Sequence, residues 1–215
     1  MIEAKIEKFL NDIGIKYEIM PCDPQLADTE DFCNYYNIPK SNSGNTIIIA
    51  SKKDPIIYSA CLVTAEYKLD VNKTVRKLMG VRRLSFASAE QTVEVTGMII
   101  GGVTPIALPS HINIYIDKNI ENLDYIILGG GSRSQKIKID INSLAKIPNA
   151  EFIEGLGITL LFNINYTCFL VESIHQVLFL KPDQSLMLFH LSMELLLFVI
   201  RLDNLLNSFH ILKLI

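Results

Sequence analysis

One short stretch, residues 96–109, reads TGMIIGGVTPIALP and holds the residues best suited to chemistry. Two adjacent glycines free the backbone to take positive φ or to approach a ligand closely, and a proline then fixes φ and removes one donor. Such a loop, here called the GGVTP loop (residues 101–105), can direct N–H groups at a substrate carbonyl or its oxyanion. The alternative is a tight bend that binds nothing, and the spacing leaves both interpretations open. The predicted catalytic donors are Gly101 and Gly102, and the predicted substrate contacts are Val103, Thr104 and Pro105.

The sequence excludes several other kinds of catalytic site. Residues 1–157 contain one histidine, His111, expected on a loop surface, and no HxE or PCxxC pattern, which excludes a zinc deaminase. No GxSxG turn presents a serine nucleophile, and no Walker lysine loop is present for nucleotide hydrolysis. The sequence therefore predicts a site made of backbone N–H groups and small polar side chains, with no metal and no cofactor.

Two further polar positions are candidates for substrate binding. Asp117 ends an apolar strand, where its carboxylate could hold a ligand amine or cap the next turn, and the cap is the commoner role. The sequence GGGSR at residues 129–133 contributes Gly130 and Ser132. This turn either lines the pocket or is a plain hairpin turn, and both interpretations stay open.

A basic run follows the first predicted hairpin. Six cations lie within sixteen residues that contain one acid, Asp70: Lys68, Lys73, Arg76, Lys77, Arg82 and Arg83. On a helix, Lys73, Arg76 and Lys77 would share one face because they are spaced i, i+3 and i+4. Residues 1–40 instead hold eight acidic and four basic side chains. The usual explanation of such a run is a solvated helix face. The alternative, more specific interpretation is a face that contacts tRNA phosphates.

These stretches resemble the YbaK family, which includes free-standing aminoacyl-tRNA deacylases and the editing domain inserted in bacterial prolyl-tRNA synthetases. The resemblance covers residues 1–157, and its most specific element is Gly102-x-x-Pro105, which matches the GxxP loop of the family. The resemblance implies hydrolysis of the ester between a wrong amino acid and the tRNA 3′ end, with assistance from the tRNA itself. It also implies an acidic pocket residue at Asp117, a glycine-rich turn at residues 129–133, and a synthetase as a partner.

One position departs from the pattern of the family. The family carries a lysine just before its first core strand, in a pattern like S-x-K-T, and residues 43–46 here read SGNT, with Asn45 in place of the lysine and Thr46 after it. Asparagine carries no charge and can only form hydrogen bonds. Asn45 is the third predicted catalytic residue and is expected to face the GGVTP loop. Either the chain belongs to a subgroup that handles its substrate differently, or it is a non-catalytic module that binds tRNA or an aminoacyl group.

Composition divides the 215-residue chain near residue 157. Residues 1–157 contain 36 charged residues and residues 158–215 contain 7, while leucine rises from 11 to 16. We expect a domain over residues 1–157 and an apolar, helical extension over 158–215 that is foreign to the family. The alternatives for this extension are an apolar partner-binding segment and a membrane anchor, although charged residues and histidines interrupt it. Four cysteines without a CxxC pair (Cys22, Cys33, Cys61 and Cys168) and a charged N-terminus predict reduced thiols in the cytoplasm.

Short strands and irregularly spaced helices should position the site. Residues 46–50 and 56–63 are β-branched and apolar and predict a hairpin, and further strands are expected over 16–20, 82–86, 112–116, 125–128 and 136–141. Asp28, Asp70, Ser88 and Asn142 are expected to cap helices. Strict βαβ alternation is absent, so the sequence predicts an α+β fold with a mixed, curved sheet packed with helices.

Overall fold

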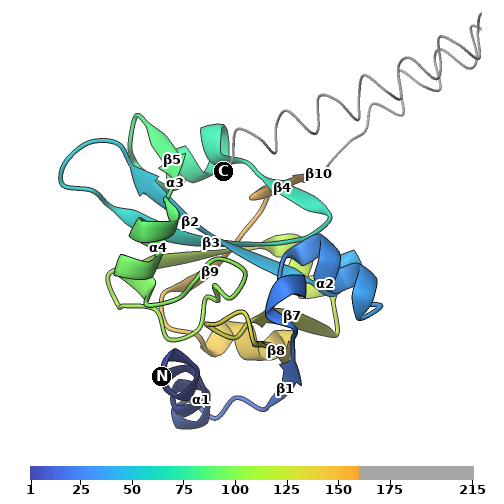
Figure 1. The fold of residues 1–215 in the computed structure, drawn as a ribbon. Helices are drawn as coiled ribbons and strands as arrows, with labels where there is room; N and C mark the ends of the chain where they lie inside the picture. Colours follow the sequence, from blue (N-terminus) through green and yellow to red (C-terminus); the bar gives the residue numbers. More distant parts are fainter. Residues whose placement is uncertain (160–215) are drawn as a thin grey trace, which may run out of the picture. The chain divides into compact units, whose positions relative to one another are not determined.

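The structure, a computed structural model, describes residues 1–159, and a five-stranded mixed sheet lies at its centre (Figure 1). Its strands, in spatial order, are β5 (Leu84–Phe86), β2 (Gly44–Ser51), β3 (Tyr58–Thr64), β6 (Asn113–Asp117) and β9 (Ala150–Ile153). β2 and β3 form the predicted hairpin. β6 runs parallel to β3, and β9 runs parallel to β6, so the chain crosses over between these strands.

The remaining strands form two smaller sheets. β1 (Tyr17–Pro21), β8 (Gln135–Asp140) and β7 (Tyr125–Gly129) form an antiparallel sheet in the order β1-β8-β7. A bridge between Ser43 and Ile127 joins this sheet to the start of β2. β4 (Tyr67–Leu69) pairs with β10 (Gly157–Thr159).

The helices are short, and their caps follow the sequence closely. They are α1 (Ile2–Asp12), α2 (Thr29–Tyr35), the π-type turn η3 (Val71–Val75), α3 (Arg76–Met79) and α4 (Ala89–Thr96), with 3₁₀ turns η1 (Pro24–Leu26), η2 (Lys40–Asn42), η4 (Lys118–Asn122) and η5 (Ile141–Lys146). Ser88 and Gln91 form the predicted capping box at α4. Asp70 accepts from the N–H groups of Lys73 and Thr74, both at 3.2 Å, and Gly80 ends α3 in the left-handed region. Both predicted caps are confirmed.

The core divides into clusters because successive side chains of a strand point to opposite faces. On one face of the five-stranded sheet, Ile48 and Leu62 pack with the three-stranded sheet β1-β8-β7, with α1 and with the loop residues Val103 and Ile106. On the other face, Ile47 and Ile49 pack beneath β4, η3 and α3. A third cluster lies between α2 and the outer face of the three-stranded sheet β1-β8-β7. Figure 1 shows α3 and β4 on one side of the central sheet, with β8 and α1 on the other.

The α+β prediction with a mixed sheet is confirmed, and three local predictions are corrected. Asp140, rather than Asn142, begins η5, because its carboxylate accepts from the Ser143 N–H at 3.2 Å. Asp28 begins α2, but its carboxylate accepts from no helix N–H, because it binds Arg133. η3 interrupts the regular α-helix that was expected to carry the basic run.

Three strands, β4, β9 and β10, were not predicted from the sequence. Because β10 covers Gly157–Thr159, it extends beyond the predicted boundary at residue 157, which stays a prediction. The predicted helices of the extension lie outside the described residues. Within residues 1–159, no helix combines the length and the hydrophobicity that crossing a bilayer requires.

Candidate active site

The GGVTP loop packs directly against the glycine-rich turn at residues 129–133, although about thirty residues separate them in the sequence. The Gly131 N–H donates to the Gly102 carbonyl at 2.7 Å, and the Ile99 N–H donates to the Gly131 carbonyl at 3.3 Å. The structure thus brings together two of the stretches that the sequence singled out. The turn of residues 129–133 is therefore part of the loop's support and is more than a hairpin connection.

The two glycines of the loop serve different purposes. Gly101 has φ of 88°, the left-handed conformation that glycine takes without strain. Gly102 does not take a positive φ, but a Cβ there would lie 2.2 Å from the Ser132 carbonyl oxygen. From the other side, a Cβ on Gly129 would lie 2.3 Å from the Val103 oxygen. The sequence predicted that Gly102 allows close approach of a ligand. In the structure, the group that approaches Gly102 closely is instead the backbone of Ser132.

The N–H of Gly102 is already used, which corrects its predicted role as an oxyanion donor. It donates to the Ile99 carbonyl at 2.9 Å and so closes a turn over residues 99–102. Within residues 1–159, the N–H groups of Val103 and Thr104 donate to no protein acceptor. The Thr104 side chain is fully buried, and its hydroxyl has no hydrogen-bond partner in the described part of the chain. The loop donor that a ligand can reach is thus the N–H of the half-buried Val103, because Thr104 is fully buried.

Pro105 lies on the side of the loop that faces α1. It lines a cavity of about 140 Å³ together with Phe9, Ile112 and Pro148, all of them apolar. This proline therefore anchors the loop to the apolar residues around that cavity.

Two predicted substrate contacts are engaged elsewhere. Asp117 is 1% exposed, and its carboxylate accepts from the N–H of Asn119 at 2.9 Å and from the N–H of Gly157. Asp117 therefore caps η4 and ties β10 to the sheet, which is the commoner role anticipated for it. The Ser132 hydroxyl donates to the Glu3 carboxylate of α1 and accepts from the Ser134 N–H, so it is engaged within the protein.

Asn45 and Thr46 lie on opposite faces of β2. Thr46 is buried with its hydroxyl unpartnered among the described residues, on the face where Ile48 packs with the loop residue Val103. Asn45 is exposed and shares its face with Ile47, in the cluster beneath η3 and α3. The expectation that a β2 side chain faces the loop therefore fits Thr46 and not Asn45. A role for Asn45 would have to come from the other face of the sheet.

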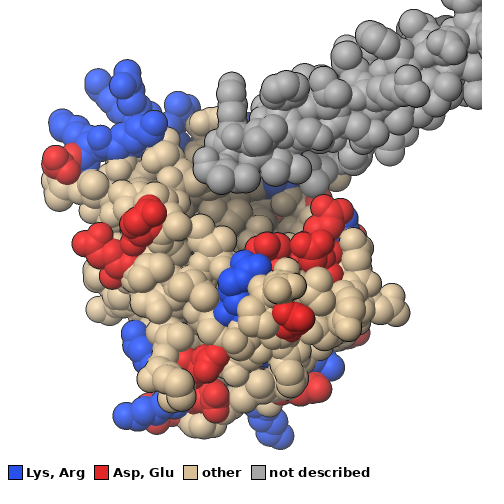
Figure 2. Space-filling view, viewed as in Figure 1, with Lys and Arg blue, Asp and Glu red and all other residues tan. Residues whose placement is uncertain are grey.

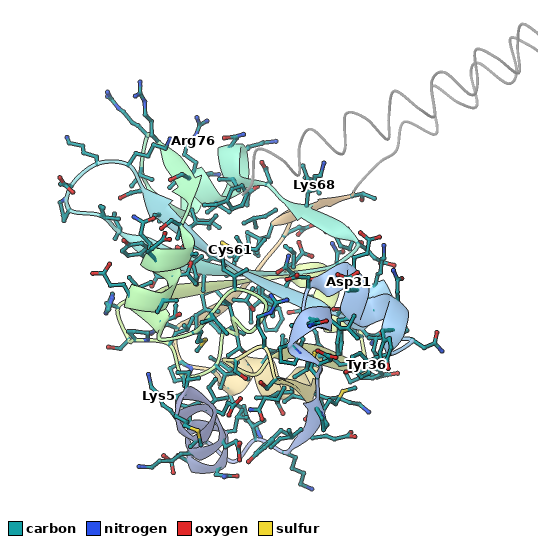
Figure 3. The ribbon with its side chains drawn as sticks, in the orientation of Figure 1. Lys5, Asp31, Tyr36, Cys61, Lys68 and Arg76 are labelled. Atoms are coloured by element: carbon teal, nitrogen blue, oxygen red, sulfur yellow. The ribbon has the colours of Figure 1, made fainter. Side chains whose placement is uncertain are left out.

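The predicted basic run forms an exposed face at one corner of the molecule. All six cations are exposed, and none of them forms an ion pair within residues 1–159. Figure 2 shows the Lys and Arg side chains gathered over the β2–β3 hairpin and α3. Figure 3 places Arg76 and Lys68 on this side of the sheet and Lys5 of α1 on the opposite side.

Two members of this face were not predicted from the sequence. Lys52 and Lys53 lie in the β2–β3 hairpin loop, are exposed, and stand next to β5 because the Lys52 N–H donates to the Arg83 carbonyl at 3.1 Å. They lie apart from the run in the sequence, and the pairing of β2 with β5, which sets Ser51 opposite Leu84, brings Lys52 beside Arg83. We call the eight cations the basic face: Lys52, Lys53, Lys68, Lys73, Arg76, Lys77, Arg82 and Arg83.

A buried lysine beneath the loop was also missed. Lys136 of β8 is 8% exposed, and its ammonium donates to the carbonyls of Ala27 and Gly101, both at 2.7 Å. Burial lowers the pKa of Lys136. In the sequence this lysine is one of two in the alternating stretch QKIKID, a pattern typical of a strand with one solvated face.

The cysteines offer no reactive thiol in the described part of the chain. Cys22, Cys33 and Cys61 are buried and free, and burial raises the pKa of Cys61 to about 12. A thiolate is the nucleophilic form, so Cys61 is unsuited to attack an ester. His111 is exposed, as predicted, and no cluster of metal-ligating side chains occurs within residues 1–159.

A match of sequence profiles places the chain in a class of protein, the aminoacyl-tRNA editing domain. The sequence profile of that family, described as "Aminoacyl-tRNA editing domain", matches residues 23–147, which is more than half of the chain. The chain belongs to this family, and aminoacyl-tRNA editing is the function that the family defines. The YbaK resemblance is thereby confirmed.

Particular relatives point to prolyl-tRNA synthetase. The chain is 29% identical over 116 residues to a proline–tRNA ligase of Brachyspira hyodysenteriae, and 29% identical over 115 residues to that of Geobacter metallireducens. Each alignment covers 54% of this chain and 19% of the ligase, so the chain spans about a fifth of these relatives.

Solved structures share the fold at low sequence identity. A candidate trans-editing enzyme for prolyl-tRNA synthetase superposes with a TM-score of 0.62 at 18% identity, over 71% of this chain and 95% of that chain. The hypothetical protein APE2540 superposes with a TM-score of 0.64 at 20% identity, over 72% and 99%. These similarities concern the fold alone.

Proposed function

We propose that this protein is a metal-independent aminoacyl-tRNA deacylase that hydrolyses mischarged tRNA in trans to a synthetase. The observation that carries the proposal is the packing of the GGVTP loop on the turn of residues 129–133, within the part of the chain that matches the editing family. This packing leaves the N–H groups of Val103 and Thr104 without a protein acceptor in the described residues. The N–H of Val103, in a fixed loop and half-buried, suits a developing oxyanion, while Thr104 lies fully buried behind it.

The chemistry follows from these groups. Water adds to the ester carbonyl carbon, and the carbonyl oxygen takes up negative charge opposite the N–H group of Val103. The bond from the carbonyl carbon to the ribose oxygen then breaks, and that oxygen leaves as a hydroxyl on the tRNA 3′ end with one proton of the water. The products are a free amino acid and an uncharged tRNA. An aminoacyl ester is already activated, so the site needs no strong protein nucleophile.

The basic face provides the tRNA contact in this proposal. Its eight exposed cations carry no ion pairs among the described residues, so they are free to neutralise phosphates. α2, with Glu30 and Asp31 in its first turn, repels a phosphate backbone. This asymmetry favours an approach of tRNA over the hairpin and α3.

A deacylation assay on mischarged tRNAs tests the proposal. The panel begins with tRNAPro carrying non-cognate amino acids, because the relatives named above are proline–tRNA ligases. We expect amino-acid release that continues at an undiminished rate in EDTA, because backbone donors need no metal. A complete loss of activity on chelation that zinc restores would contradict the mechanism.

One observation favours a second candidate, a module that binds aminoacyl-tRNA without cleaving it. Asn45 replaces the lysine of the family pattern and is exposed on the face of β2 opposite Thr46. Asparagine at this position can form hydrogen bonds but carries no charge, so the cation of the family pattern is missing from this face of β2. Tight tRNA binding without release of any amino acid across the panel would support this candidate.

A further inference from the structure

Two cations hold together two segments that are far apart in the sequence. Arg133 donates from Nε to the Pro24 carbonyl at 2.7 Å and from Nη1 to the Ile100 carbonyl at 3.3 Å. Lys136 donates to the carbonyls of Ala27 and Gly101. Each cation therefore joins the segment ahead of α2 (residues 24–28) to the turn that begins the GGVTP loop (residues 99–102). We call Arg133 and Lys136 the cation pair.

The burial of Lys136 calls for an explanation beyond packing. No carboxylate forms an ion pair with its ammonium in the described part of the chain, and the centre of the Phe32 ring lies 5.1 Å from it. A buried cation without a carboxylate partner is costly, and an apolar side chain at the same position often gives equal or greater stability. Arg133 has a partner, because it binds both carboxylate oxygens of Asp28 at 2.9 and 3.1 Å. A buried and unpaired lysine is more typical of a functional site than of a core.

Two of the four carbonyls that the cation pair holds, those of Ile100 and Gly101, belong to the turn of residues 99–102. The turn is closed by the hydrogen bond from the Gly102 N–H to the Ile99 carbonyl, and its third residue, Gly101, has φ of 88°. The central peptide of this four-residue turn joins Ile100 to Gly101. If that peptide rotates, the Ile100 carbonyl points in the opposite direction. Arg133 fixes the Ile100 carbonyl and Lys136 fixes the next one. Rotation of either peptide would break a charge-assisted hydrogen bond.

We propose that Lys136, with Arg133, positions the GGVTP loop for catalysis by locking the turn of residues 99–102 against the segment ahead of α2. Because the chain continues directly from Gly102, this lock fixes the direction of the N–H groups of Val103 and Thr104. Lys136 is a positioning residue, since it acts through the Gly101 carbonyl and not on the ester. This inference rests on the proposed function for its catalytic consequence, but the loop geometry can be tested without it.

The experiment compares the variants Lys136→Met and Lys136→Arg in the full chain. The control is Lys138→Met, which removes the second lysine of β8, where the side chain packs on Tyr125 and pairs with Glu18. For each variant we measure single-turnover amino-acid release, tRNA affinity, and amide hydrogen exchange over residues 99–104. We expect Lys136→Met to slow release by at least tenfold, with tRNA affinity unchanged and faster exchange in the loop. Lys136→Arg should recover part of the rate because it keeps the charge, and Lys138→Met should behave as wild type.

The pH profile gives a readout that a purely structural lysine would not change. The groups that face Lys136 are Cys22, Cys33, Asp28 and Arg133. Because burial lowers the pKa of Lys136, its ammonium loses the proton at a lower pH than an exposed lysine does. The ratio of the wild-type rate to the Lys136→Met rate should therefore fall as pH rises through that pKa. A ratio that is constant with pH would overturn the proposal.

The remaining outcomes separate this inference from the proposed function. Wild-type release and wild-type exchange in Lys136→Met would overturn the positioning role. Faster loop exchange with an unchanged rate would also overturn it, because the loop would then not be the site. If the wild type releases no amino acid from any tRNA, the proposed function fails while the exchange data still test the lock. If Lys136→Met does not fold, Arg133→Met takes its place, since Arg133 is less buried, and a smaller effect in the same direction is expected.

Discussion

Substitution of Gly102 by alanine tests whether the loop and the turn of residues 129–133 are packed as closely as the structure shows. The added Cβ would lie 2.2 Å from the Ser132 carbonyl oxygen and 2.5 Å from its carbon. These atoms are backbone and cannot swing aside as the end of a flexible side chain can. The loop and the turn must therefore separate by about 1 Å or more to reach ordinary van der Waals contact.

The expected cost combines overpacking with the loss of a hydrogen bond. Overpacking in a tight site costs about 1–3 kcal/mol. Separation also lengthens the 2.7 Å hydrogen bond from the Gly131 N–H to the Gly102 carbonyl, which is worth about 1 kcal/mol. We expect a loss of roughly 2–4 kcal/mol in the free energy of unfolding, which lowers the melting temperature by about 5–15 °C for a domain of this size.

The control variant is Gly80→Ala, which isolates backbone strain from steric overlap. Gly80 has φ of +65° and open space where an added Cβ would lie, so alanine there should cost about 1 kcal/mol. Gly129→Ala presses on the same contact from the other side, because its Cβ would meet the Gly102 oxygen at 2.4 Å. The double variant Gly102→Ala, Gly129→Ala should lose less stability than the sum of the two, since one separation accommodates both methyl groups.

Thermal unfolding and single-turnover deacylation are measured on the same preparations. Gly102→Ala should release amino acid more slowly than Gly80→Ala at a temperature where both are folded, because only the former displaces Val103 and Thr104. A Gly102→Ala protein that melts within about 2 °C of wild type would refute the close packing of the loop on the turn.

The other predictions concern the basic face, Asn45 and the length of chain that the fold requires. Reversal of Arg76 and Lys77 to glutamate should weaken tRNA binding and flatten its dependence on salt, whereas unchanged affinity and slope in a filter-binding titration would reduce the basic face to an ordinary solvated surface. Asn45→Ala should slow amino-acid release by less than about tenfold, the upper bound for one neutral hydrogen bond, because Asn45 lies on the face of β2 opposite the loop, and Asn45→Lys should add little; restoration of activity by lysine to an inactive wild type would instead identify a decayed editor. Truncation after Thr159 should leave a folded domain of equal activity, because the described residues already contain three buried clusters, and circular dichroism showing an unfolded product would contradict this.

Much of the fold could be predicted because local chemistry specifies it. The capping box at Ser88 and Gln91, the cap at Asp70 and the glycine that ends α3 depend on residues a few positions apart. The β2–β3 hairpin is equally local. β9 and β10 were missed because each is short, and their pairing with β6 and β4 joins residues that are distant along the chain.

The candidate site was predicted only in part. The sequence identified both glycine segments, but assigned Gly102 a free N–H that the structure shows bound to Ile99. From the sequence, Asp117 could either contact the substrate or cap a turn. In the structure its carboxylate accepts hydrogen bonds from the N–H groups of Asn119 and Gly157. Residue type states what a group can bind, whereas the neighbours brought by folding decide what it does bind.

The sequence by itself determined the family and the local elements of this protein, because GxxP spacing, capping residues and β-branched runs act over short distances. The tertiary structure alone decided which side chains share a face, because the pleat of β2 separates Thr46 from Asn45 and the pairing of β2 with β5 brings Lys52 beside Arg83. It alone also turned Lys136 from a strand residue into a buried cation beneath the loop. The physical reason is that burial and charge pairing depend on contacts between segments far apart in the sequence, which no local pattern records.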